Sequence, residues 1–414
     1  MARPSATHCL RLGVLLASMP ALSGAKCFDY EPELSRELAQ PQQQQPSEPN
    51  SCQPPAPPPP SVEAMRGEAC IGTRCYADDV VAYWKPHWDE HARERTIVFQ
   101  ESGPDDYSFE VTDASGAAAA LEFAAGVPVT LTLVNPAQAS SGPHDLTAPS
   151  FFRSVAWWKV ETSGGEYLAP TFDAIGVSHS EDAEHRAVLR FVPIKAGEYT
   201  AWSAEGVDAG RQFADIVTGE VSPDLQTGDA GAGMVTSIKV VPAGQLTLFQ
   251  GGNPNRELAL DQDPRRSLEH DVWEPDSLHT VRVEARESLD PQTGASVFTF
   301  DWSTRQFKAN AGTVLEIRSG ADNEFQHDIT APDLVRDSVT AVTRDAQARV
   351  YAPYLDSIHI SPDTTIEMLF VPTVVADYRV YCGHGVVHDA SGEPDLETGH
   401  AKAGMHDWIS VAPP

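Results

Sequence analysis

The sequence predicts an all-β fold with two tandem Greek-key β-sandwich domains, preceded by a signal peptide and a Pro/Gln-rich tether. Two observations lead to this prediction. One sequence pattern occurs twice along the chain, and each copy consists of short stretches of β-branched and apolar residues separated by turn residues. Long amphipathic helical patterns are absent, so short strands over each copy favour β-sandwiches.

The first 25 residues are predicted to be a signal peptide. Arg3 and Arg11 supply positive charge, residues 12–22 form an apolar stretch too short to span a bilayer, and residues 23–25 are small enough for cleavage. We therefore expect export to the periplasm or the cell exterior. Lys26 precedes Cys27 where a lipoprotein would carry a small residue, and lipid anchoring stays open.

Residues 26–94 are predicted to form a tether followed by a small cap. Residues 26–62 are dominated by Gln, Pro, Glu and Ser, which cannot bury a core. Cys27, Cys52, Cys70 and Cys75 follow the signal peptide and can form two disulfides in an oxidising compartment. Their pairing cannot be deduced from the sequence. A haem attachment is not expected because no Cys-x-x-Cys-His occurs.

Four matched segments establish the internal repeat. They keep their order along the chain, and in the last one nine of twelve positions are identical. The matches are 144–149 with 327–332, 169–175 with 352–358, 191–193 with 370–372, and 223–234 with 394–405. We call the two copies the N-terminal copy and the C-terminal copy, and we predict domains at 95–243 and 295–414, joined by a connecting segment at 244–294.

The charge balance limits the class of partner. The chain carries 59 acidic and 29 basic residues, for a formal net charge of -30. Such a chain is a poor nucleic-acid binder, because phosphate neutralisation needs clustered Lys and Arg. High solubility, an acidic or salty medium, or a basic protein partner would account for the surplus of acid. No stretch after the signal peptide is long and apolar enough for a transmembrane helix.

A copper site is predicted in the C-terminal copy. Cys382 is the lone cysteine in more than 300 residues, and in an oxidising compartment it is either buried and inert, a nucleophile or a metal ligand. His327 follows a predicted strand, and His400 and Met405 come shortly before the last one. Two imidazoles, one thiolate and a weak thioether form the type 1 ligand set, which suits both oxidation states of copper.

This arrangement resembles the cupredoxin (type 1 blue copper) family, which places one ligand His early and a Cys, His and Met late. The residues that carry the resemblance are His327, then 378–382, then 400–405. The resemblance implies the fold, one type 1 copper ion bound by His327, Cys382, His400 and Met405, and a role in electron transfer. It covers residues 295–414 directly and extends to 95–243 through the repeat.

One feature departs from small cupredoxins. These place the loop His only a few residues after the Cys, whereas 17 residues separate Cys382 from His400. His384 and His388 are rivals for the ligand position, but only His400 precedes a correctly spaced Met. The role of the loop at 383–399 is left open, and His406 is expected to point away from the site.

The N-terminal copy is predicted to be a degenerate domain without copper. It keeps His144 and Met234 but has Ser203 and Asp229 where Cys382 and His400 align. A hydroxyl and a carboxylate do not replace a thiolate and an imidazole at such a site. Docking, oligomer formation and simple packing are open roles for this copy.

The expected function is single-electron transfer between redox proteins outside the cytoplasm, with a basic protein such as a cytochrome c as one partner. Copper storage or delivery is the first alternative, and a subunit of a copper oxidoreductase of the nitrite-reductase type is the second. A catalytic centre is not expected. None of the 14 histidines forms a His-x-His pair, Tyr381 rather than His precedes the Cys, and position 386 is Val rather than Cys.

Overall fold

The computed structural model describes residues 59–103, 106–137, 142–207, 223–249, 278–352, 355, 357–388 and 393–414. Within them the predicted all-β fold is confirmed, because the chain forms two eleven-stranded sheets that pack around one large apolar core. The predicted signal peptide and the predicted tether up to residue 58, with Cys27 and Cys52, lie outside the described residues. None of the described helices is long and apolar enough to cross a membrane.

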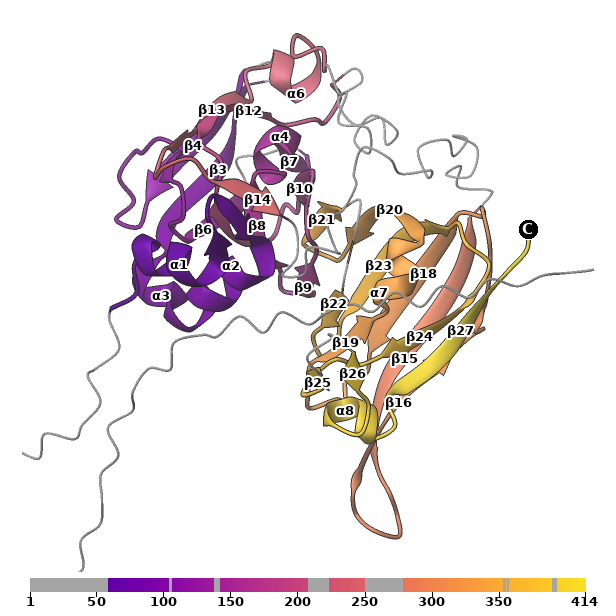
Figure 1. The fold of residues 1–414 in the computed structure, drawn as a ribbon. Helices are drawn as coiled ribbons and strands as arrows, with labels where there is room; N and C mark the ends of the chain where they lie inside the picture. The colour runs from indigo at the N-terminus through magenta and orange to yellow at the C-terminus, as the bar shows by residue number, and fades with distance from the viewer. Residues whose placement is uncertain are drawn as a thin grey trace, which may run out of the picture. The chain divides into compact units, whose positions relative to one another are not determined.

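The two copies contain equivalent strands (Figure 1). The N-terminal copy contains β3 (Arg93–Gly103), β4 (Asp106–Asp113), β5 (Glu122–Ala124), β6 (Val129–Asn135), β7 (His144–Thr147), β8 (Val155–Glu161), β9 (Gly165–Leu168), β10 (Ala174–Val177), β11 (His185–Pro193), β12 (Gly197–Trp202) and β13 (Val235–Val241), with short helices α4 (Pro149–Phe152) and α6 (Gly228–Gly231).

The C-terminal copy repeats this order. It contains β15 (His279–Leu289), β16 (Ser296–Trp302), β17 (Gln306–Lys308), β18 (Thr313–Ser319), β19 (His327–Thr330), β20 (Ser338–Arg344), β21 (Ala348–Tyr351), β22 (Ser357–Ile360), β23 (Thr365–Pro372), β24 (Asp377–Tyr381), β25 (Val387–His388), β26 (Pro394–Asp395) and β27 (His406–Ala412), with short helices α7 (Pro332–Arg336) and α8 (Gly399–Lys402).

Both sheets run through both copies. One has the order β16-β15-β18-β23-β20-β21-β10-β7-β12-β13-β5, and the other has the order β17-β27-β24-β19-β22-β9-β8-β11-β6-β3-β4. The copies meet at two antiparallel strand pairs, β10 with β21 and β9 with β22. The edge strands β9 and β10 of the N-terminal copy are therefore paired with the edge strands β22 and β21 of the C-terminal copy, and the outer edges of the two sheets are β16, β5, β17 and β4.

The burial pattern explains why these segments form strands. Along β11, Ala187, Leu189 and Phe191 are fully buried while Val188 and Arg190 between them are partly exposed. Successive side chains of a strand point to opposite faces of its sheet, so this alternation directs one face into the core. The inner strand β7 and the junction strand β10 each have neighbours on both sides and are buried along their whole length.

A helical cap packs on the N-terminal copy. It consists of α1 (Val62–Ala69), β1 (Cys70–Ile71), β2 (Arg74–Tyr76), α2 (Ala77–Trp84), η1 (Lys85–His87) and α3 (Trp88–His91). Trp84 and Trp88 are buried in a separate cluster that includes Ala156 and Val192 of the sheet beneath. A disulfide joins Cys70 to Cys75, which settles the pairing of these two cysteines.

The predicted connecting segment, 244–294, is regular over much of its described part. β14 (Thr247–Phe249) pairs with β2 of the cap. β15 pairs with β16 and β18, so it is a strand of the C-terminal sandwich in the position that β3 has in the N-terminal copy. The sequence analysis missed β15, although its alternation of buried Val281, Val283 and Ala285 is a strand signal.

Candidate metal centre

Three of the four sequence-predicted ligands come from different elements that meet at one end of the C-terminal sandwich. His327 is the first residue of β19, Cys382 directly follows β24, and His400 lies on α8. β19 and β24 are neighbours in one sheet, with Thr330 opposite Tyr381, so His327 and Cys382 emerge side by side. In Figure 1, α8 lies next to β25 and β26 at this same end.

The ligand atoms of His327, Cys382 and His400 lie within 4.8 Å of one another. The thiol sulfur of Cys382 is 3.5 Å from Nδ1 of His400, and the two imidazole centroids are 5.2 Å apart. His327 and Cys382 are buried and His400 is half-buried. This is the only cluster of three such residues in the described part of the chain.

His327 presents one nitrogen to the centre. Its Nε2 lies 2.9 Å from Oε1 of Glu287, while its Nδ1 is buried and has no hydrogen-bond partner among the described residues. Burial lowers the pKa of His327 and so favours the neutral imidazole, although Glu287 acts in the opposite direction. An orphaned, buried imidazole nitrogen that faces a thiol and a second imidazole fits a metal ion, which would satisfy it.

Glu287, at the end of β15, fixes the ring of His327 and was missed by the sequence analysis. Its carboxylate accepts hydrogen bonds from the backbone N–H groups of Glu324 (3.1 Å) and Phe325 (2.9 Å). Burial raises the pKa of Glu287, but these hydrogen bonds and His327 outweigh it and lower the pKa overall. Metal-binding histidines commonly use such a carboxylate to set their tautomer and orientation.

Cys382 is buried and is contacted by Asp328 and its neighbours. The backbone N–H of Asp328 donates to its sulfur over 3.3 Å, and the carboxylate of Asp328 accepts from the backbone N–H of Gly383. Burial raises the pKa of Cys382 to about 12, with the nearby charge of Asp328 acting in the same direction. Without a metal the sulfur therefore keeps its proton, and a bound cation would be needed to hold the thiolate.

His400 is held by α8 and by aromatic contacts. Its ring lies 4.3 Å from that of Phe298 and 4.6 Å from that of His384, measured between centroids. Burial, together with His384 and His327, lowers the pKa of His400 to about 4. The imidazole is thus neutral at neutral pH and has a lone pair for a metal.

Met405 follows α8 and is fully buried in the core. Its carbonyl accepts from the backbone N–H of Cys382 over 2.9 Å, and its N–H donates to the carbonyl of His400 over 3.1 Å. The backbone therefore ties Met405 to both neighbouring ligands. The next residue, His406, is exposed, in line with the expectation that it points away from the site.

The rival histidines lie outside the cluster of three. His384 is exposed and touches the ring of His400 from the solvent side. His388 is exposed on β25, with its Nε2 3.4 Å from the hydroxyl of Tyr381. The structure thus places His400, the histidine chosen for its spacing to Met405, beside His327 and Cys382, and leaves His384 and His388 outside this cluster.

The equivalent place in the N-terminal copy has different chemistry on the same backbone. The N–H of Asp145 donates to Oγ of Ser203 over 3.3 Å, as that of Asp328 does to Cys382. Asp229 lies 2.8 Å from Nδ1 of His144, and Glu101 lies 2.7 Å from its Nε2. Both nitrogens of His144 are therefore engaged by carboxylates.

The donor set of the C-terminal copy fits copper. A soft thiol and two neutral imidazoles within 4.8 Å of one another, with one orphaned nitrogen, match the preference of copper for sulfur and imidazole ligands. His327 and Cys382 are positioned by the strands β19 and β24 of the β-sandwich, and His400 is positioned by α8. His327, Cys382 and His400 would hold the ion, with Met405 as the weaker fourth ligand.

No protein-family model and no curated protein matches the chain. Solved structures that match include the Cu-containing nitrite reductase from Thermus scotoductus SA-01, at 12% identity and a TM-score of 0.23, over 78% of this chain and 61% of that one. The copper nitrite reductase from Nitrosomonas europaea matches at 11% identity and a TM-score of 0.23, over 77% of this chain and 93% of that one.

The multicopper oxidase from Campylobacter jejuni matches at 10% identity and a TM-score of 0.25, over 78% of this chain and 65% of that one. The chain thus spans less than two thirds of the Thermus and Campylobacter proteins. At these identities and TM-scores the likenesses carry no argument about activity, and the centre is judged on its own geometry.

Proposed function

We propose that this chain is an exported type 1 copper protein that passes single electrons between redox partners. The observation that carries the proposal is the cluster of His327, Cys382 and His400, in which a buried Nδ1 faces a thiol and a neutral imidazole. Copper bound there would supply a reversible one-electron couple. The resemblance of 327, 378–382 and 400–405 to cupredoxins supports the same role.

The chain's own residues would do three things for such a centre. Glu287 holds the ring of His327 so that Nδ1 points to the site. Asp328 donates a backbone hydrogen bond to the Cys382 sulfur and lowers its electron density. Burial of His327 and Cys382 keeps bulk water from both ligands, and the half-buried His400 is the ligand closest to solvent.

Export and partners belong to the same proposal. The Cys70–Cys75 disulfide supports an oxidising compartment, as the predicted signal peptide requires. The net charge of -30 favours a basic redox partner such as a cytochrome c. An electron carrier needs no substrate pocket of its own.

The test is to load the exported chain with Cu(II) and record the visible spectrum beside the Cys382→Ser variant. A strong thiolate–copper absorption that Cys382→Ser abolishes, together with reversible reduction, supports the proposal. Unchanged copper uptake without colour in both proteins contradicts it. A site that holds only Cu(I) and cannot be cycled would instead indicate storage or delivery.

A further inference from the structure

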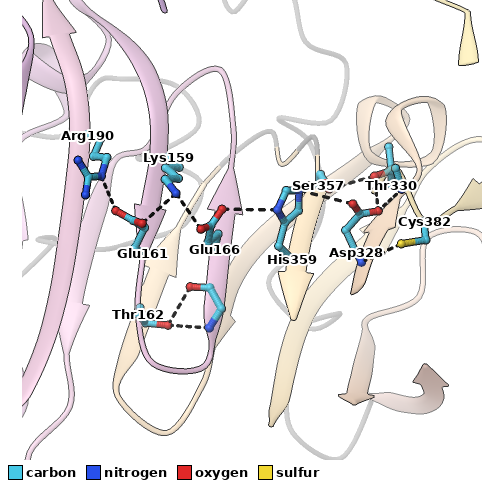
Figure 2. A network of polar contacts seen from close by, with 12 residues as sticks. Lys159, Glu161, Thr162, Glu166, Arg190, Asp328, Thr330, Ser357, His359 and Cys382 are labelled. Atoms are coloured by element: carbon cyan, nitrogen blue, oxygen red, sulfur yellow. Dashed lines mark hydrogen bonds and ion pairs between the residues drawn. The ribbon is translucent and has the colours of Figure 1, made fainter. Parts of the chain in front are cut away.

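A row of polar side chains leads from the N-terminal copy to Cys382 in the C-terminal copy. On the three adjacent antiparallel strands β9, β22 and β19, Glu166 lies opposite His359 and His359 lies opposite Asp328. Residues directly opposite one another project from the same face of a sheet. The three side chains therefore form one row across the junction between the copies (Figure 2).

The side chains in this row make contact. Nδ1 of His359 lies 3.5 Å from Oε2 of Glu166, and Nε2 of His359 lies 3.7 Å from Oδ2 of Asp328. The other carboxylate oxygen of Glu166 accepts a hydrogen bond from Lys159 over 2.7 Å. His359 therefore bridges two carboxylates, one from each copy.

Asp328 connects this row of side chains to Cys382, the predicted copper ligand. Its Oδ1 accepts hydrogen bonds from Thr330 and from the backbone N–H of Gly383, while its own N–H donates to the Cys382 sulfur. One carboxylate oxygen thus holds the backbone next to the predicted ligand, and the other faces His359. Movement of His359 would change how Asp328 holds this segment.

The other junction lacks the row, although the repeat makes the two junctions equivalent. In the pairing of β10 with β21, Gly176 takes the place of His359 and lies between Asp145 and Arg349. Glycine has no side chain to bridge the two neighbours. Among the described residues, a histidine bridge across the copies is therefore found only at the junction of β9 with β22, which leads to the predicted copper ligands.

Close approach of the two strands is needed for the bridge. Gly165 on β9 lies opposite Ile360, and a Cβ at Gly165 would come within 2.0 Å of the carbonyl oxygen of His359. A residue larger than glycine would push β9 and β22 apart at this point. The local sequence of β9 thus permits the contact between Glu166 and His359.

We propose that Glu166 and His359 are positioning residues for the Cys382 side of the copper centre, so that the copper-free copy helps to set the redox properties of its partner copy. The inference rests on the proposed function for its redox part only. Its structural part, that Glu166 and His359 hold Asp328 and through it Gly383, applies to the metal-free protein as well.

The test compares Glu166→Gln and His359→Gln with a matched control, Glu161→Gln, in the full exported chain. Glu161 lies opposite Glu166 on β8 and pairs with Lys159 and Arg190 of the N-terminal copy. The control removes an equal charge from the same network without touching His359. Thermal melting of each variant checks that it is folded.

The first readout uses metal-free protein and measures amide hydrogen exchange at Gly383. We expect faster exchange in Glu166→Gln and His359→Gln than in wild type and Glu161→Gln. A double variant with Glu166→Gln and His359→Gln should show the same exchange rate at Gly383 as the single variants, because both residues act through one bridge. Wild-type exchange rates at Gly383 in both single variants overturn the proposal.

The second readout is the midpoint potential of the copper-loaded proteins. A hydrogen bond to the sulfur favours the reduced ion, so a loosened Asp328 should lower the potential relative to Glu161→Gln. A potential equal to or above that of the control overturns the redox part. If wild type shows no thiolate–copper absorption, the proposed function fails, whereas the exchange measurement still decides the positioning role.

Discussion

At the scale of single residues, the two copies show how two substitutions change the chemistry of one site. His144 and His327 occupy equivalent positions, and each has a glutamate at Nε2. At Nδ1, His144 meets Asp229, whereas His327 meets no partner among the described residues. Carboxylates therefore engage both ring nitrogens of His144, whereas Nδ1 of His327 stays available to a metal ion.

The charged cluster around His144 should make the N-terminal copy sensitive to pH. Burial alone would lower the pKa of His144, but hydrogen bonds and charges from Asp229 and Glu101 raise it above 6.5. A raised folded-state pKa stabilises the fold below the unfolded value, and this contribution is lost as the pH rises through the folded value. Stability should therefore fall as the pH rises from about 6.5.

This prediction is checked by denaturant unfolding of wild type and His144→Gln between neutral and alkaline pH. The free energy of unfolding of the variant should be about 3 kcal/mol lower than that of wild type, because a buried charged pair is left incomplete. The difference between the two proteins should shrink as the pH rises. A difference that is constant with pH would show that His144 is not protonated in the folded state.

Restoring two residues should restore a metal centre in the N-terminal copy. Ser203→Cys with Asp229→His returns the thiol and the second imidazole, while His144, Glu101 and Met234 are already in place. We expect copper uptake and thiolate–copper absorption to double. Ser203→Cys alone is the control, because Asp229 still engages Nδ1 of His144, and an equal gain from it would contradict the prediction.

At the scale of elements, the one-turn helix α8 positions His400 through a glycine. Gly399 has φ +57°, and a Cβ there would lie 2.4 Å from the carbonyl oxygen of His384. Gly228, the first residue of α6, has φ +55° at the equivalent place, so both copies need a left-handed residue at this turn. The Thr-Gly pair at the start of each helix thus meets a requirement of the backbone.

Gly399→Ala should displace His400 and weaken copper binding. The left-handed conformation costs a non-glycine residue about 1 kcal/mol, and the contact with His384 adds to the strain. We expect at least a tenfold loss of copper affinity in a competition titration, with the fold kept. Gly294→Ala, at a left-handed turn with open space around it, is the matched control and should bind copper as wild type does.

At the scale of the whole molecule, residues 58–414 form one compact unit, with both sheets passing from one copy to the other. The pairings of β9 with β22 and of β10 with β21 supply backbone hydrogen bonds that neither copy can make alone. The role of the N-terminal copy therefore includes completing the sheets of the copy with the predicted copper ligands.

The continuity of the sheets predicts one cooperative thermal transition for both copies. Copper binding to the folded state should raise the midpoint of the whole transition, including the tryptophan signal of the N-terminal copy. Calorimetry of the metal-free and loaded chain is the measurement. Gly165→Ala should split the transition by separating β9 from β22, and two separate transitions in wild type would contradict the prediction.

The sequence by itself determined the β class, the repeat and the ligand candidates. The alternation of a strand has a period of two residues, and His400 and Met405 lie only five positions apart. Both signals are therefore local and can be recognised in short segments of the sequence. The difference between the copies was also visible there, because Ser203 and Asp229 align with Cys382 and His400.

The residues that contact the predicted ligands were determined only by the tertiary structure. Glu287 reaches His327 from a strand 40 positions earlier, and Glu166 reaches His359 from the other copy. Such contacts depend on strand order and register, which long-range pairing and core packing set together. These contacts leave no local pattern in the sequence. Glu287 and Glu166 could therefore be identified only from the pairing of strands in the two sheets.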